Sequence, residues 1–280
     1  MPNLPSGSNN IFEFKKLQAD WPVDVQSGFR MDPLYFMDLV VFQVKDCLFR
    51  IPRIYFEKHS PYFKKLYLNP RFEGDNRGSS TTDPILLEDV TVAEFRDFMT
   101  YICPPAAPYD VSPMVLNAAI RLSTLWRFNR IRASVIATLT RLDDSSPFTL
   151  VWMGLVYTIS AFLKKGLLEL VKFRIILQPN ELVLLEAYGA LKGVEKLKKG
   201  RGWRTVSMSI INEEFKEVIR KVEQKEKMYD PDAREGSAGV DNMAGKKNGD
   251  GDILDDDVRE AEERMKAMIL ERYGCPCGHQ

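Results

Sequence analysis

Apolar and polar residues change their spacing within one stretch of the chain, residues 38–66. The apolar residues of 40–44 recur at every second position, which is the spacing of a strand with one buried face. The polar pair at 45–46 favours a two-residue turn, and 47–51 predicts a second strand. Beyond 52 the apolar residues recur at steps of three and four, which indicates helix. The stretch therefore predicts a β-hairpin that leads directly into two short helices.

Helix-start signals mark the elements that follow. The apolar run at 84–87 predicts a short buried strand. Thr91 has Glu94 three residues later, which is the pattern of a capping box. Ser112 is followed by Pro113, a residue favoured at the first position of a helix. These signals predict helices over 92–102, 113–128 and 130–142.

The chain beyond residue 146 has a less regular helical pattern. We expect helices between 147 and 198, interrupted at Gly166, Gly189 and Gly193, and one long amphipathic helix over 207–228. The run 147–163 carries no charge and approaches the length of a membrane span. Its polar residues and an internal glycine favour a buried core helix instead.

These patterns predict an α+β fold with five parts. The first three are a flexible N-terminus at 1–30, a domain with strands and helices at 31–143, and a helical extension at 144–228. A disordered linker follows at 229–252. The last part, 253–280, contains a short charged helix at about 254–272 and the C-terminal tail.

Composition narrows the function classes. The 39 Lys and Arg residues balance 39 Asp and Glu residues, so the net charge gives no general attraction to nucleic acid or membrane. The four cysteines, two inside predicted elements and two at 275 and 277, do not form the framework of a disulfide-rich domain. The N-terminal residues lack the pattern of a signal peptide. We expect an intracellular protein, in the cytoplasm or the nucleus.

One basic segment stands out, residues 192–204. It could contact phosphate or an acidic partner, although such a run is more often a solvated helix end followed by a loop. It supports an alternative function, that of a transcription-associated regulator. Nucleic acid and membrane are both disfavoured as partners.

Residues capable of catalysis or metal binding form no convincing group. The two histidines are His59, expected within a helix in a structural role, and His279. No phosphate-binding or dinucleotide-binding glycine motif occurs. Cys275, Cys277 and His279 have the wrong number and spacing for a structural zinc site. The acidic run 248–259 lacks the Gly and Glu that a calcium loop requires. We therefore predict no enzyme activity, no cofactor and no metal.

The predicted order of elements over 36–142 resembles that of the BTB/POZ domain. The residues that carry the resemblance are Asp38, Val40, Phe42, Val44, Phe49, Arg53, Ser60, Phe63, Leu66 and Phe95. Two positions depart from the family pattern: Pro52 stands where animal members usually have His, and 101–105 replaces a Tyr-Thr-Gly turn. Both departures, and the segment 176–197, are similar to a divergent fungal branch of unknown function.

The resemblance implies a fold and a kind of function. The fold is a short mixed sheet capped by helices, and the function is protein–protein interaction, commonly as a homodimer. Family members act as adaptors or scaffolds for cullin-type ubiquitin ligases or for transcriptional complexes. The family's charged pocket at the dimer interface corresponds to Asp38 and Arg53 here. The alternative is that Asp38 merely begins the strand at the surface.

Overall fold

The computed structural model describes residues 22–23, 28–32, 36–70, 74–104, 111–142, 145–200 and 205–231, and these form an α+β structure. The chain divides into two compact units. Unit 1 comprises 1–58 and 64–90, and unit 2 comprises 59–63 and 91–280. The predicted domain boundaries stay predictions. The predicted charged helix and most of the predicted linker and N-terminal segment lie outside the described residues.

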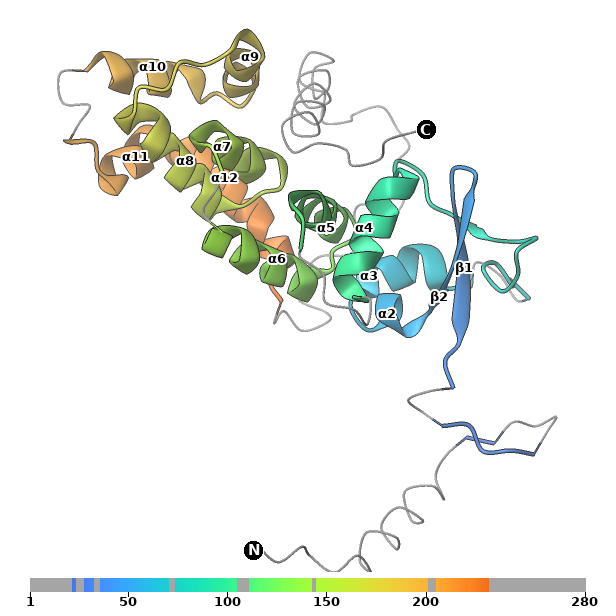
Figure 1. Cartoon of the computed structure of the whole chain (residues 1–280). Helices are drawn as coiled ribbons and strands as arrows, with labels where there is room; N and C mark the ends of the chain where they lie inside the picture. The colour runs from blue at the N-terminus through green and yellow to red at the C-terminus, as the bar shows by residue number, and fades with distance from the viewer. Residues whose placement is uncertain are drawn as a thin grey trace, which may run out of the picture. The chain divides into compact units, whose positions relative to one another are not determined.

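A three-stranded sheet forms the centre of unit 1. Strand β1 (Leu39–Val44) pairs antiparallel with β2 (Cys47–Pro52) and parallel with β3 (Ile85–Leu86), in the order β2-β1-β3 (Figure 1). The turn between β1 and β2 contains two residues, and Lys45 adopts a left-handed backbone there, with a φ of 54°. The predicted hairpin and the predicted third strand are thus confirmed.

One face of this sheet forms the core of unit 1. Val40, Phe42 and Val44 are almost fully buried, and so is Phe56 from helix α2 (Ile54–Glu57). The rings of Phe42 and Phe56 pack with their centroids 4.9 Å apart. The alternation in β1 therefore indicated this buried face, but it did not indicate that Val41, on the other face, is also buried at 2% exposed.

The second predicted helix of this region has an irregular turn. After α3 (Pro61–Phe63), residues Lys64–Leu68 form a π-helical turn, in which the Asn69 amide donates to the Lys64 carbonyl at 2.9 Å. A π turn is wider than an α turn, so inward positions no longer recur at three or four residues. Leu68 is consequently buried, whereas Leu66, expected in the core, is 45% exposed. His59 likewise lies in the turn between α2 and α3, outside either helix.

Unit 2 contains the next three helices. They are α4 (Val92–Ile102), α5 (Pro113–Leu125) and α6 (Asn129–Leu142). Thr91 and Glu94 form the predicted capping box, and the Ser112 hydroxyl accepts a hydrogen bond from the Val115 amide. Helix α5 ends earlier than predicted, because Arg127 adopts a left-handed backbone with a φ of 54°.

Five aromatic side chains fill the core of this part of unit 2. Each is at most 2% exposed, and their rings meet mainly edge to face. They are Phe63, Phe95, Phe98, Trp126 and Phe128. Phe63 joins α3 to the later helices of the same unit, since its ring centroid lies 5.1 Å from that of Trp126.

The remaining helices complete unit 2 (Figure 1). They are α7 (Pro147–Val156), α8 (Ser160–Lys172), α9 (Pro179–Ala187), α10 (Leu191–Lys199), α11 (Met208–Glu214) and α12 (Lys216–Glu226), followed by the 3₁₀ turn η3 (Lys227–Tyr229). The helix predicted over 207–228 is therefore divided. The division occurs at Phe215, which turns inward and is buried.

Two of the three predicted glycine breaks are wrong. Gly189 does end a helix, with a φ of 74°, but Gly166 lies inside α8 and Gly193 inside α10. The uncharged run 147–163 forms two buried helical segments, because Thr158, with a φ of 60°, interrupts it. Across the described ranges, no helix combines the length and apolar character needed to cross a membrane.

Candidate protein-interaction site

The second face of the sheet in unit 1 carries exposed leucines. Residues directly opposite one another on paired strands point to the same face. Gln43 lies opposite Leu48 of β2 and beside Leu86 of β3, and Leu39 points to the same side four residues earlier in β1. Leu39, Leu48 and Leu86 are 44%, 46% and 50% exposed. We call these three residues the outer leucine face.

Charged groups of both signs border the outer leucine face. Arg50 is exposed and lies opposite Val41, which is on the same face of the sheet but is buried. Asp38 is exposed immediately before β1 begins. The free side of β2 pairs with no further strand among the described residues. An apolar sheet face beside an unpaired edge is a surface that can associate with another chain.

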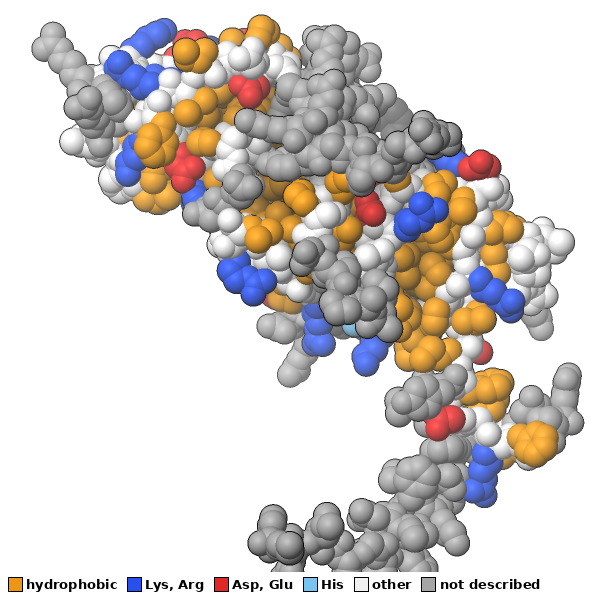
Figure 2. Space-filling view, in the orientation of Figure 1, with side chains coloured by type: hydrophobic (Ala, Val, Ile, Leu, Met, Phe, Trp, Pro, Cys, Tyr) orange, Lys and Arg blue, Asp and Glu red, His pale blue; other side chains and the backbone are white. Residues whose placement is uncertain are grey.

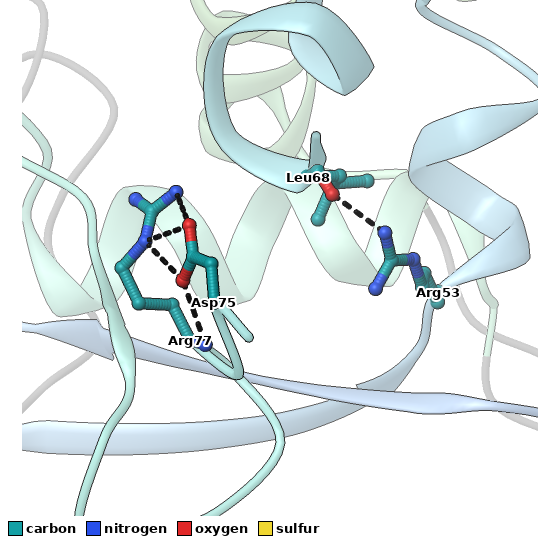
Figure 3. A network of polar contacts seen from close by, with 4 residues as sticks. All are labelled: Arg53, Leu68, Asp75 and Arg77. Atoms are coloured by element: carbon teal, nitrogen blue, oxygen red, sulfur yellow. Dashed lines mark hydrogen bonds and ion pairs between the residues drawn. The ribbon is translucent and has the colours of Figure 1, made fainter. Parts of the chain in front are cut away.

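Arg53 fixes the end of the hairpin, although not in the way expected. Its backbone amide donates to the Asp38 carbonyl at 2.8 Å. Its side chain donates from Nε to Glu57 at 2.8 Å and from Nη2 to the Leu68 carbonyl at 2.6 Å (Figure 3). Arg53 immediately precedes α2, which places Glu57 one turn further on and within reach of the guanidinium.

Asp38 and Arg53, which the resemblance places in a charged pocket at a dimer interface, form no side-chain pair with each other within this single chain. The Arg53 side chain donates to the Glu57 carboxylate and to the Leu68 carbonyl, and the Asp38 side chain is exposed. In the single chain, Asp38 lies at the surface just before the strand begins, as the alternative interpretation predicted. Whether Asp38 belongs to a pocket between two copies stays a prediction.

The loop before β3 is anchored by contacts that the sequence analysis missed. Arg77 donates from Nε and Nη2 to both carboxylate oxygens of Asp75 at 2.8–3.0 Å, and hydrogen bonding to Asp75 raises the pKa of Arg77 (Figure 3). Gly78 has a φ of 80°, and a Cβ there would lie 2.8 Å from Val40 Cγ2. The Gly78 carbonyl accepts from the Val41 amide at 2.7 Å. The loop is thus fixed against β1, which holds the sheet in place.

Most of the residues that carry the family resemblance lie in the interior. Val40, Phe42, Val44, Ser60, Phe63 and Phe95 are buried, Phe49 is half-buried and Leu66 is exposed. The resemblance therefore rests on residues that maintain the fold. The exposure of Leu39, Leu48 and Leu86 was not predicted, because the alternation of residues along one strand does not show which face of the sheet is covered.

The basic segment is largely engaged in local contacts where it is described. Lys196 pairs with Glu214 at 2.6 Å, Lys199 pairs with Glu195 at 3.3 Å, and Lys198 donates to the Ile175 carbonyl at 2.5 Å. Burial lowers the pKa of Lys198. Figure 2 shows basic and acidic side chains mixed over this part of unit 2. Residues 201–204 lie outside the described part, and no described contact favours the alternative regulatory function.

The described residues hold no metal-binding cluster. Among them, no group of three or more His, Cys, Asp or Glu side chains could hold an ion, and Cys47 and Cys103 are free thiols. The candidate residues Cys275, Cys277 and His279, and the acidic run 248–259, lie outside the described part of the chain.

A comparison with protein-family models finds no match, and a comparison with curated proteins finds none. The BTB/POZ resemblance thus rests on the residues quoted above.

Proposed function

We propose that this chain is a non-enzymatic protein-interaction module that pairs with a second copy of itself through the outer leucine face. The observation that carries the proposal is the exposure of Leu39, Leu48 and Leu86 on one face of a sheet whose edge strand β2 has no described neighbour. Burying three half-exposed leucines on each of two chains removes apolar area from water, which drives association.

The charges beside the leucines favour a second copy as the partner. A two-fold contact places the same patch on both sides, so the patch must be complementary to itself. Arg50 supplies an exposed cation and Asp38 an exposed anion beside the same leucines. Each can therefore meet its opposite charge on the other chain. Exposed Phe36 and Met37 extend the apolar surface just before β1.

The arrangement of elements also supports the proposal. From β1 through α6 the elements follow the order strand, strand, helix, helix, strand, helix, helix, helix, which agrees with the order expected from the BTB/POZ resemblance. That resemblance implies a homodimeric adaptor or scaffold. Recruitment of a cullin-type ubiquitin-ligase scaffold is one version of this function. Affinity purification from the native cell, with a cullin as the recovered partner, tests that version, and recovery of chromatin proteins instead contradicts it.

Light scattering on the purified full chain tests the pairing. We expect a mass about twice the 32.1 kDa of one chain. The substitutions Leu48→Arg and Leu86→Arg should yield monomers, because they place charge in the contact. Leu125→Arg is the matched control, since Leu125 is 47% exposed in α5 and lies in unit 2.

Two outcomes overturn the proposal: a monomeric wild-type chain, or a dimer that survives both substitutions. Circular dichroism establishes that each variant is folded. Asp38→Asn tests the pocket separately, because an equally stable dimer with asparagine excludes a role for the Asp38 charge.

A further inference from the structure

The free edge of strand β2 presents backbone groups to which the described residues add no further strand. Residues that flank a two-residue turn form a hydrogen-bonded pair, so Val44 and Cys47 exchange backbone bonds and every second pair after them does the same. The Arg53 amide donates to the Asp38 carbonyl at 2.8 Å, which continues this alternation beyond the end of β2. The backbone groups of the odd-numbered residues of β2 therefore face β1.

The even-numbered residues of β2 face the free edge. Leu48 and Arg50 direct their N–H and C=O groups away from β1, and both side chains are exposed. Pro52, at the end of the strand, offers only a carbonyl there because proline has no N–H. The Cys47 thiol lies 3.9 Å from the Leu48 carbonyl, a long and weak contact. This edge can therefore pair with a strand from another chain.

A second copy of the chain offers a strand with the same pattern. Two identical strands related by a two-fold axis run antiparallel, and one residue lies on the axis opposite itself. If that residue were Arg50, two like charges would be opposite each other and Leu48 would face Pro52, which lacks a donor. If it were Leu48, only the Leu48 pair would form ladder hydrogen bonds before the strands reached the turn at 45–46.

A register with Phe49 on the axis uses the edge most fully. Leu48 of each chain then lies opposite Arg50 of the other, and each of these pairs exchanges both of its hydrogen bonds. The aliphatic part of the Arg50 side chain can lie along Leu48 on the outer face. The two half-buried Phe49 side chains become direct neighbours on the inner face, where a cross-strand aromatic pair is stabilising.

We propose that two copies of the chain join their β2 edges antiparallel, with Phe49 on the two-fold axis, so that the sheet continues across the contact. The contact is small and supplies few hydrogen bonds, so it associates single chains only weakly. It does not depend on the pairing through the outer leucine face. Growth beyond two chains does rest on that proposed function, because two different two-fold contacts on one chain link pairs into larger assemblies.

Disulfide trapping in the full chain tests the register. Serine replaces all four cysteines, Leu86→Arg removes the leucine-face pairing, and one cysteine is introduced by Leu48→Cys or by Arg50→Cys. Positions opposite each other on paired strands are close enough for a disulfide, whereas in this register the same position on the two chains is diagonal and too distant. Under mild oxidation, a mixture of the two proteins should form a covalent dimer at least about tenfold faster than either protein alone.

Equal rates for the mixture and the single proteins, or fastest cross-linking of Leu48→Cys with itself, would overturn the proposal. Failure of the leucine-face pairing has a different signature. It appears as an unchanged mass of Leu86→Arg in light scattering of a dilute sample, where the weak edge contact is not occupied.

Proline at residue 50 gives a second test. The Arg50 N–H faces away from β1, so Arg50→Pro removes an edge donor without breaking the hairpin. At about tenfold the concentration that completes pairing, the wild-type mass should exceed that of a pair, and Arg50→Pro should reduce it to a pair. Arg50→Ala removes the same side chain but keeps the N–H, so it should retain the larger assemblies. Equal losses in the two variants would overturn the edge contact, and a wild-type mass that never exceeds a pair would contradict the larger assemblies.

Discussion

The hydroxyl of Ser60 donates a hydrogen bond to the backbone carbonyl of Trp126 at 2.5 Å, across 66 residues of sequence. The same hydroxyl accepts from the Phe63 amide at 2.8 Å. Ser60 thus caps the start of α3 and satisfies the carbonyl of the residue that ends α5. All of these atoms lie in the interior, where an unpaired polar group is costly.

Replacing Ser60 with alanine should therefore destabilise unit 2. The change leaves a buried amide and a buried carbonyl without their partner, and we expect the free energy of unfolding to fall by about 1–3 kcal/mol. Urea denaturation followed by tryptophan fluorescence measures the loss. Ser79→Ala is the control, because Ser79 is exposed; equal stability of the two variants would contradict the proposed role of Ser60.

Arg132 joins three parts of unit 2 from a position that is 3% exposed. Its Nη2 donates to the carbonyls of Tyr157 and Thr158, both at 2.8 Å, in the turn between α7 and α8. The Tyr229 ring covers the guanidinium, with 4.3 Å from Cζ to the ring centroid. Burial lowers the pKa of Arg132, because enclosing a positive charge costs free energy. The two hydrogen bonds and the contact with the Tyr229 ring offset this cost.

Arg132→Met should lower the free energy of unfolding by about 3 kcal/mol, because two buried carbonyls lose a charged donor. Arg132→Lys should restore only part of this stability, since an ammonium cannot reproduce the planar fork of guanidinium donors. Thermal denaturation measures both variants. Arg130→Met provides the comparison, because Arg130 is exposed on the same helix; a similar loss in that variant would show that Arg132 has no special role.

The local signals in the sequence predicted the local structure well. The two-residue spacing of 40–44 predicted the strand and the face that carries Val40, Phe42 and Val44, although Val41 on the other face is also buried. The capping box predicted the start of α4 at its observed residue. These features depend on residues close in sequence. The π turn at 64–68 was not predictable in this way, since it changes which apolar residue is buried without any signal in the apolar pattern.

Long-range contacts explain the other failures. The burial of Arg132 was not predicted, because the carbonyls that it binds come from the turn at 157–158. Within the single chain the Arg53 side chain binds Glu57 and the Leu68 carbonyl, and the pocket at a dimer interface that the resemblance implies for Asp38 and Arg53 stays a prediction. The exposure of Leu39, Leu48 and Leu86 depends on which residues cover the sheet. The apolar pattern of a single strand does not show this.

Gly166 was expected to interrupt a helix and instead allows two helices to meet. A Cβ at Gly166 in α8 would lie 2.7 Å from the Pro147 carbonyl oxygen and the Val151 nitrogen of α7, both backbone atoms. Alanine normally stabilises a helix interior relative to glycine by about 1 kcal/mol. Here Gly166→Ala should destabilise the protein by about 1–3 kcal/mol, because the backbones must separate.

The melting temperature of Gly166→Ala checks this expectation. Gly200→Ala is the control, since the nearest atom to a Cβ at Gly200 is 3.4 Å away and its φ of −64° suits any residue. An unchanged or higher melting temperature for Gly166→Ala would mean that α7 and α8 can separate without cost.

Asp97 in α4 should make stability depend on pH. Burial raises its pKa above the ordinary value of 3.8, with a further contribution from the nearby Glu94, while Arg96 acts in the opposite direction. A raised pKa means that the folded protein binds the proton more tightly than the unfolded chain does. The ionised carboxylate therefore costs stability above the folded pKa, and this cost disappears as the pH falls below 3.8.

Asp97→Asn should consequently stabilise the protein at pH 7 and have a smaller effect at pH 3, where the wild-type carboxyl is also neutral. Urea denaturation at a series of pH values measures the difference between the two proteins. Glu213→Gln, which removes an exposed carboxylate, should show no comparable change. If the advantage of Asp97→Asn grew as the pH fell, the ionised carboxylate would be stabilising, and burial would not be the dominant influence on Asp97.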